Sequence, residues 1–296
     1  MTPHEYLQSV LEEEKFDINE EPEIKEKRDE VEELMRTEYG NRIVSFKYSG
    51  SIAKYTAIKT SKDMDLAIHF KHDAFSTLKE MYDSIKVFLE KHYTVREQRV
   101  SLGLDGLNVD VVPGRRISKD DLANNDVNLY RSDTATSIKT NIEIHKEHVR
   151  NSDSREIIKL IKIWRERWGL KFKSFAVELL VIKALDGFAS TGLDNKVKKV
   201  LNYIKDEVET VNLVDPANSN NNVADIIDYS RKLLFKTTAT TCLSELDNAG
   251  SDKDKLLSAW KFVYKDNNQN ESNSAPTNGF IMATQDWKRQ PDRRHG

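Results

Sequence analysis

Residues 43–70 hold two strand-like segments joined by a Gly-Ser turn, and this order restricts the possible folds more than any other feature. In the first segment apolar and polar side chains alternate, which is typical of a half-buried strand. Gly50 and Ser51 follow it. The second segment, MDLAIHF, is preceded by Asp63 and contains Asp65, and Asp63 comes twelve residues after the serine. Because side chains two residues apart in a strand point the same way, we expect Asp63 and Asp65 on one face of a sheet.

A third carboxylate, Asp110, stands alone among apolar residues in the strand-like segment 107–112. Burying an unpaired carboxylate is costly, so Asp110 needs a partner, and a metal ion shared with Asp63 and Asp65 would supply one. Carboxylate oxygens are hard ligands that suit Mg²⁺ or Mn²⁺ and disfavour zinc. Three carboxylates around two such ions are what phosphoryl or nucleotidyl transfer requires. One ion lowers the pKa of an attacking hydroxyl, and the other neutralises the triphosphate and the leaving pyrophosphate.

The turn between the first two strands suits a phosphate. Gly50 would let the backbone approach closely, and the Ser51 hydroxyl and the turn amides could donate hydrogen bonds. Neither the Gly-Ser pair nor the Asp-x-Asp pair is specific by itself, since aspartates often cap turns at strand ends. Their joint order is more specific. It runs from a strand through the Gly-Ser turn to a strand with two aspartates, then a helix and a strand with the third aspartate.

The pattern changes near residue 150 from strands flanked by helices to helices alone. Before that point, Pro22 and Gly40 predict the start and the end of a helix. Periodicity predicts a helix at 73–92, strands at 93–100 and at 107–112 (the last stopped by Pro113-Gly114), and helices at 157–168, 175–185, 197–211 and 224–235. A loop at 217–222, a polar linker at 266–279 and a basic tail at 288–296 complete the pattern. We therefore expect an α+β fold with one lobe at residues 1–150, including the N-terminal helices, and a helical lobe at 151–296.

Composition excludes several classes of protein. The 46 Lys and Arg against 49 Asp and Glu give a formal net charge of −3, which argues against binding nucleic acid through bulk positive charge. A single cysteine, Cys242, excludes an intrachain disulfide framework and a multi-cysteine zinc ribbon. There is no run of 18 apolar residues, and the start of the chain is acidic where a signal peptide is basic and then apolar. We therefore expect a cytoplasmic protein that does not span a membrane.

The joint motif resembles that of polymerase-beta-type nucleotidyltransferases, in the segments GSIAKYTAIKTSKDMDLAIHF (50–70) and LNVDVVPG (107–114). Two later segments are similar to oligoadenylate synthetases, cyclic GMP-AMP synthase and their bacterial relatives, the CD-NTases of CBASS anti-phage systems. They are REIIKLIKIWRERWGLKFKSFAVELL (155–180) and VDPANSNNNVA (214–224). The resemblance implies a polymerase-beta-like nucleotidyltransferase lobe, with a mixed sheet and helices, packed against a C-terminal helical lobe. The active site would lie between the lobes.

The resemblance also implies roles for single residues of the first lobe. Asp63 and Asp65 would ligate two Mg²⁺ ions, for which Mn²⁺ could substitute. Asp110 would complete the metal site and help to activate the acceptor hydroxyl. Gly50 and Ser51 would hold the donor triphosphate.

In the second lobe, Lys162 matches a lysine that reaches the triphosphate, Ser174 a serine that contacts phosphate, and Phe175 an aromatic residue that stacks on the donor base. Each has a structural alternative. Lys162 could be a solvated lysine, Ser174 a helix N-cap, and Phe175 a core residue. Asp215 reads as a loop-capping residue. His145 and His148 are one helical turn apart, but no third metal ligand is near them. We therefore expect His145 to be an exposed residue and not part of a metal site.

The function that the resemblance implies is synthesis of a cyclic di- or trinucleotide second messenger from nucleoside triphosphates (ATP, GTP, UTP or CTP) in anti-phage defence. The product would activate a separate effector protein. The net charge and the missing zinc element argue against activation by long double-stranded DNA. Two alternatives stay open. One is template-free synthesis of linear oligonucleotides, of the oligoadenylate or tRNA-end type. The other is a non-catalytic nucleotide-binding protein on the same fold, against which the intact set of three aspartates counts.

Overall fold

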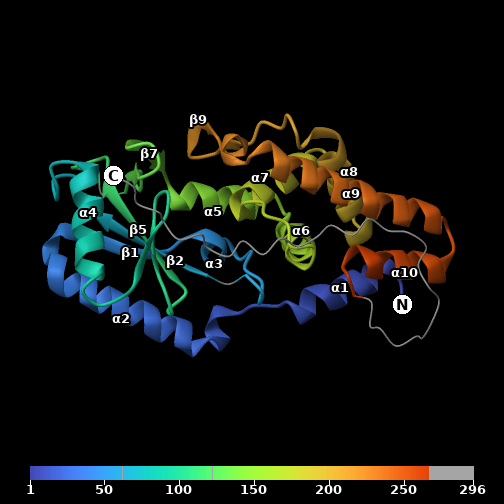
Figure 1. Cartoon of the computed structure of the whole chain (residues 1–296), viewed down its shortest axis with the longest axis horizontal. Coiled ribbons are helices and arrows are strands. Elements are labelled where there is room, and N and C mark those ends of the chain that lie inside the picture. The colour runs from blue at the N-terminus through green and yellow to red at the C-terminus, as the bar shows by residue number, and fades with distance from the viewer. Residues whose placement is uncertain (62, 122, 267–296) are drawn as a thin grey trace, which may run out of the picture. The chain divides into compact units, whose positions relative to one another are not determined.

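The computed structural model describes residues 1–61, 63–121 and 123–266, and it combines a mixed sheet with a set of helices (Figure 1). The strands are β1 (Ile43–Tyr48), β2 (Met64–Phe70), β3 (Val95–Glu97), β4 (Leu102–Leu104), β5 (Val109–Arg116), β6 (Val127–Arg131), β7 (Thr136–Thr140), β8 (Val214–Asp215) and β9 (Asn218–Asn222). The α-helices are α1 (Pro3–Glu13), α2 (Pro22–Tyr39), α3 (Gly50–Lys54), α4 (Leu78–Leu89), α5 (Ile142–Asn151), α6 (Arg155–Arg167), α7 (Ser174–Leu185), α8 (Leu193–Glu207), α9 (Tyr229–Ala249) and α10 (Lys253–Val263). The predicted α+β class is confirmed.

Seven strands form one sheet, with β2 and β5 side by side near its centre. The order is β1-β2-β5-β4-β3, and β5 also pairs with β6, which pairs with β7. β2 and β5 run parallel, while the other pairs of this sheet are antiparallel. In the parallel register Asp65 stands opposite Asp110. Both aspartates therefore lie where these two strands begin, and their side chains reach the same face of the sheet.

Two hydrophobic cores stabilise the described part of the chain. One lies between the sheet and the helices α2 and α4, which Figure 1 shows against it, and it includes Val31 and Leu66. The other joins α6 to α10 around the fully buried Trp164. The N-terminal helix α1 belongs to this second core through Tyr6, and it contacts α6, α8 and α10. The division of the chain at residue 150 stays a prediction.

Local capping explains where the predicted helices begin and end. Helix α2 runs from Pro22 to Tyr39, and Gly40 follows it with a φ of +49°, as predicted. Helix α4 begins later than residue 73, because the Thr77 side chain caps it by accepting the Glu80 N–H at 3.0 Å. The predicted strand 93–100 is reduced to β3, and β4, β6 and β7 were not predicted.

The strand that carries Asp110 is longer than predicted. β5 continues through Pro113 and Gly114 to Arg116, so the expectation that this Pro-Gly pair stops it is wrong. Its first three residues pair with β4, and its pairing with β6 begins at Gly114. Pro113, which has no N–H to donate, falls between the two pairings. Gly114 fits because a Cβ there would stand 3.0 Å from side chains of β6.

The helical part differs from prediction in several places, and helix α10 was not predicted. The Asn-rich segment 217–222, predicted as a loop, contains β9, which pairs with β8. Helix α9 continues to Ala249, well beyond the predicted end at residue 235. In it the hydroxyls of Thr238 and Thr240 donate to carbonyls four residues earlier, at 2.8 and 2.9 Å, so these polar groups are satisfied within the helix. The predicted linker beyond Asp266 and the predicted tail lie outside the described residues. Among the described helices, none is long and apolar enough to cross a membrane.

Candidate active site

The two central strands present Asp65 and Asp110 as a carboxylate pair. Asp63 is exposed and lies just before β2, which begins at Met64. Burial and the charge of Asp110 raise the pKa of Asp65 to about 7. Burial also raises the pKa of Asp110, although a hydrogen bond from Gln98 opposes the shift. Two carboxylates side by side repel each other, and a cation bound between them would offset both the burial and the repulsion.

Gly50 packs directly against Asp65. Its φ of +58° is in the left-handed region, and a Cβ at this position would stand 1.7 Å from Asp65 Oδ2. Only glycine therefore fits here with Asp65 in its observed place. Ser49 ties the same turn to β2, because its N–H and its hydroxyl both donate to the Asp65 carbonyl, at 2.8 and 3.2 Å. Ser51 is the second residue of the short helix α3 and is half-buried.

The chemistry of the carboxylate pair fits a divalent cation, since Asp65 and Asp110 offer hard oxygen donors that are short of positive charge. A third ligand is not in place. Within residues 1–61, 63–121 and 123–266, no group of three or more His, Cys, Asp or Glu side chains is close enough to hold a metal ion. Asp110 has a different neighbour that was not predicted, since Gln98 Nε2 donates to its two oxygens at 2.8 and 2.9 Å.

A buried charged network connects α3 to the helical core. Lys54, the last residue of α3, forms an ion pair with Glu178 of α7. Thr56 Oγ1 donates to the other oxygen of Glu178 at 2.8 Å, and Lys162 Nζ donates to the Thr56 carbonyl at 2.8 Å. Lys162 Nζ also lies 3.9 Å from Glu178 Oε1. All four residues are buried, so the interpretation of Lys162 as a solvated lysine is wrong, and burial lowers its pKa to about 8.

Ser174 and Phe175 begin helix α7. Its N-cap is Lys173, so the prediction of Ser174 as the N-cap is wrong by one residue. The Ser174 hydroxyl instead accepts a hydrogen bond from Arg165 Nη1 at 3.0 Å. The Phe175 ring is half-buried, and Lys54 Nζ lies 4.9 Å from its centroid.

Ser174 and Phe175 line a cavity of about 560 Å³ that Gln98 also lines. This volume is in the range of small-molecule sites. On its wall the ring of His145 lies 4.7 Å from that of Phe175, centroid to centroid. His145 Nε2 lies 2.7 Å from Asp215 Oδ1, so His145 has a buried partner and its prediction as an exposed residue is wrong. Asp215 also accepts the Ala217 N–H at 2.9 Å and so caps its loop as predicted.

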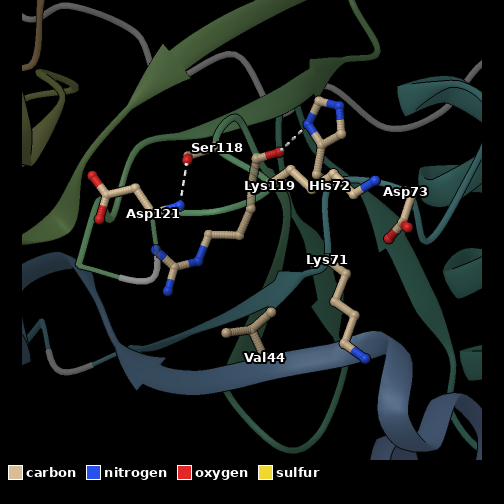
Figure 2. Close-up of a pocket in the computed structure, with 8 residues that line it drawn as sticks. Val44, Lys71, His72, Asp73, Ser118, Lys119 and Asp121 are labelled. Carbon is tan, nitrogen blue, oxygen red and sulfur yellow. Dashed lines mark hydrogen bonds between the residues drawn. The ribbon is translucent and has the colours of Figure 1, made fainter.

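A second cavity, of about 320 Å³, lies at the opposite end of the same strands (Figure 2). Lys71 follows β2 directly and stands six residues from Asp65, which corresponds to roughly 20 Å along a strand. Figure 2 shows His72 on its wall, where His72 Nδ1 lies 3.3 Å from the Arg116 carbonyl. The wall carries both signs of charge; it consists of Val44, Lys71, His72, Asp73, Arg116, Ser118, Lys119 and Asp121. None of the predicted site residues, all of which are described, contributes to it.

The chain is similar to known proteins in sequence and in structure. No protein-family model matches the chain. In sequence it is similar to the cyclic AMP-AMP-AMP synthase of Escherichia coli (strain MS 115-1), with 26% identity over 267 residues covering 73% of this chain and 80% of the relative. In structure it is similar to E. coli MS115-1 CdnC solved with ATP, with a TM-score of 0.69, 20% identity, and 89% of this chain and 98% of that chain covered.

A further similar structure is Elizabethkingia meningoseptica CdnE, a cyclic dinucleotide synthase solved with GTP and Apcpp. Its TM-score is 0.57 at 16% identity, with 73% of this chain and 90% of that chain covered. The structural likenesses show that the fold is shared. They confirm the predicted polymerase-beta-like architecture.

Proposed function

We propose that the chain belongs to the CD-NTase family of nucleotidyltransferases, and that it joins nucleoside triphosphates into a cyclic di- or trinucleotide and releases pyrophosphate. The observation that carries the proposal is the pair of Asp65 and Asp110 in register on parallel strands, with Gly50 packed against Asp65. The E. coli relative is named a cyclic AMP-AMP-AMP synthase. ATP is therefore the first substrate to test, and a cyclic trinucleotide the first product to look for.

The proposed reaction is an in-line attack of a ribose 2′- or 3′-hydroxyl on an α-phosphate. Two divalent ions, Mg²⁺ or Mn²⁺, would lower the pKa of this hydroxyl and neutralise the triphosphate when bound. Asp65 and Asp110 would hold them, and Asp63 would join from the loop before β2. Asp110 would also help to remove the proton of the acceptor hydroxyl. Burial and the charge of Asp110 raise the pKa of Asp65, and a cation bound between the two carboxylates would favour the ionised form of both.

Residues around the cavity would position the nucleotide. The turn at Gly50 would bring backbone amides close to a phosphate, and the Ser51 hydroxyl would donate to it. Ser174 accepts from Arg165, which leaves its own hydroxyl proton free to donate to a phosphate oxygen. The Phe175 ring would stack on the donor base. A contact between Lys162 and the triphosphate would require its ammonium group to leave the Thr56 carbonyl.

The biological role follows from the product. A cyclic oligonucleotide made from abundant triphosphates would act as a second messenger in anti-phage defence and bind a separate effector protein. Its synthesis would take place in the cytoplasm, where the substrates are. With 49 acidic against 46 basic residues, the chain has no excess of positive charge that would favour long double-stranded DNA as its activator.

Product analysis tests the proposal. The protein is incubated with each radiolabelled nucleoside triphosphate, alone and mixed, with Mg²⁺ or Mn²⁺, and the products are treated with phosphatase and separated. We expect a phosphatase-resistant product that disappears in Asp65→Asn and in Asp110→Asn. Asp83→Asn is the matched control, because Asp83 is an exposed residue of α4 paired with Lys79. A phosphatase-sensitive ladder would show a linear product instead, and a product that persists in both site variants would refute the assigned site.

A further inference from the structure

Gln98 lies in the turn between β3 and β4 and faces the carboxylate of Asp110. Its Nε2 is 2.8 Å from Oδ1 and 2.9 Å from Oδ2, so one amide group contacts both oxygens. A carboxylate only accepts hydrogen bonds, so the nitrogen end of the amide must be the end that faces Asp110. Ser101 stabilises this orientation, because its hydroxyl donates to Gln98 Oε1 at 3.2 Å.

The backbone of the same turn is held in place from two sides. The Tyr82 hydroxyl, from α4, lies 3.1 Å from the carbonyl oxygens of both Gln98 and Ser101. The Ser132 hydroxyl, after β6, donates to the Gln98 carbonyl at 2.8 Å. Within the turn the Gln98 N–H donates to the Ser101 carbonyl at 3.0 Å. The side chain of Gln98 therefore extends from a fixed backbone. This limits the positions that its amide can take and favours the contact with Asp110.

Gly103 leaves the space that this contact needs. It stands opposite Asp110 in the antiparallel register of β4 and β5. A Cβ at this position would lie 3.0 Å from Asp110 Oδ1, 3.0 Å from Gln98 Nε2 and 2.8 Å from Arg96 Nη2. Because Gly103 has no side chain, the amide of Gln98 has room to contact Asp110.

We propose that Gln98 is a positioning residue for divalent-metal binding: it holds the Asp110 carboxylate in the orientation from which it ligates the ion shared with Asp65. The inference rests on the proposed function and deepens it. Residues that hydrogen-bond to metal-ligating side chains orient those ligands, and their loss typically costs about 10- to 100-fold in metal affinity or activity. Gln98 would act through Asp110 and not as a metal ligand itself.

Mn²⁺ binding to the full-length protein without nucleotide tests this directly. It is measured by electron paramagnetic resonance of the free ion, alongside kcat and KM for ATP. Gln98→Met keeps the length of the side chain and removes the amide, and Gln8→Met, on the exposed surface of α1, is the matched control. We expect Gln98→Met to weaken Mn²⁺ binding by about 10- to 100-fold. The KM for ATP at saturating Mn²⁺ should stay unchanged, and excess Mn²⁺ should restore much of kcat.

Gly103→Ala is a second variant that disturbs the same contact without removing the amide, and it should weaken Mn²⁺ binding in the same direction. It decides the question if Gln98→Met does not fold. Unchanged or tighter Mn²⁺ binding in the folded variants would overturn the inference while leaving the proposed function intact, provided that the wild type binds Mn²⁺ and forms product. If the wild type does neither, the proposed function fails, and this inference fails with it. A lower melting temperature with unchanged Mn²⁺ affinity would show a merely structural role and would also overturn it.

Discussion

Replacing Gly50 by alanine should abolish the proposed activity by displacing a carboxylate. The added Cβ would lie 1.7 Å from Asp65 Oδ2, whereas real Cβ atoms essentially never come closer than 3.0 Å to another heavy atom. Either the Asp65 carboxylate or the turn must therefore move by about 1.3 Å, the difference between these two distances. A misplacement of about 1 Å at a reacting centre can cost about 100-fold in rate, so we expect a loss of at least that size. This loss corresponds to about 2.7 kcal/mol in the activation barrier.

The substitution also strains the backbone, and a matched variant separates the two effects. Gly50 has a φ of +58°, and an L-residue in this left-handed region costs about 1–2 kcal/mol. Gly169 has a φ of +65°, but no atom lies within 4 Å of a Cβ built there. In urea denaturation Gly169→Ala should lose about this amount of stability, and Gly50→Ala should lose it together with the cost of displacing Asp65. Only Gly50→Ala should lose activity.

The assay is the initial rate of phosphatase-resistant product formation at saturating ATP and Mn²⁺, measured well below both melting temperatures. If Gly50→Ala keeps a rate within about threefold of Gly169→Ala, a difference below 1 kcal/mol, the close approach of Gly50 to Asp65 does not matter for catalysis. The reasoning from the 1.7 Å contact would then be refuted.

Three other predictions concern buried or stacking groups. Burial lowers the pKa of His69 to about 4 from 6.5, so the unfolded chain binds this proton first as the pH falls. The contribution of His69 to the urea-measured free energy of unfolding, taken as the difference between the wild type and His69→Gln, should therefore drop by about 2 kcal/mol from pH 7 to pH 5, and a constant difference would contradict it. Glu178→Gln should lower the same free energy by about 3–5 kcal/mol at pH 7, because Lys54 and Lys162 lose their buried counter-ion, and an unchanged value would contradict the network. Phe175→Leu should raise KM for ATP by about tenfold while changing kcat less, as expected for a lost base stack, and an unchanged KM would exclude that role.

Regular strands were predictable, whereas their pairing was only partly so. β1 and β2 alternate in polarity or are apolar throughout, which identifies them locally. The direction of Asp65 within β2 follows from the same local rule. Its position opposite Asp110 depends on how two distant segments pair, which periodicity does not determine. The only signal for that pairing was indirect. A buried Asp110 needs a partner, and a cation shared with the other aspartates would supply one.

Short and polar elements escaped prediction for physical reasons. β4 has three residues, Leu102–Leu104, which is too short for a periodic pattern. β9 consists of Asn and Ser, so no apolar face marks it as a strand. Side chains stabilise its hairpin instead, since Asn222 Oδ1 accepts the Leu213 N–H at 2.8 Å and Asn221 Nδ2 donates to Asp215 at 3.2 Å.

The directions of Lys162 and Gln98 could not be predicted from their neighbours in the sequence. Helix α6 has a wide apolar face, and Lys162 stands between Ile161 and Ile163, so periodicity determines its direction only loosely. The direction of Lys162 is set by Thr56 and Glu178, which come from other segments. Gln98 left one usable signal. A glycine in the middle of β4, opposite an aspartate, indicates that another group approaches there.

The ion pair between Lys54 and Glu178 restricts how parts of this protein can be exchanged with relatives. Lys54 belongs to the short helix that begins at Gly50, whereas Glu178 lies in a helix of the second core. A chimera that replaced residues 151–266 alone would leave a buried ammonium group facing whatever residue the donor protein has at position 178. An unpaired buried charge is strongly destabilising. A chimera should therefore exchange residues 50–56 together with the helical core. The segments that must be exchanged together thus lie on both sides of the predicted boundary at residue 150.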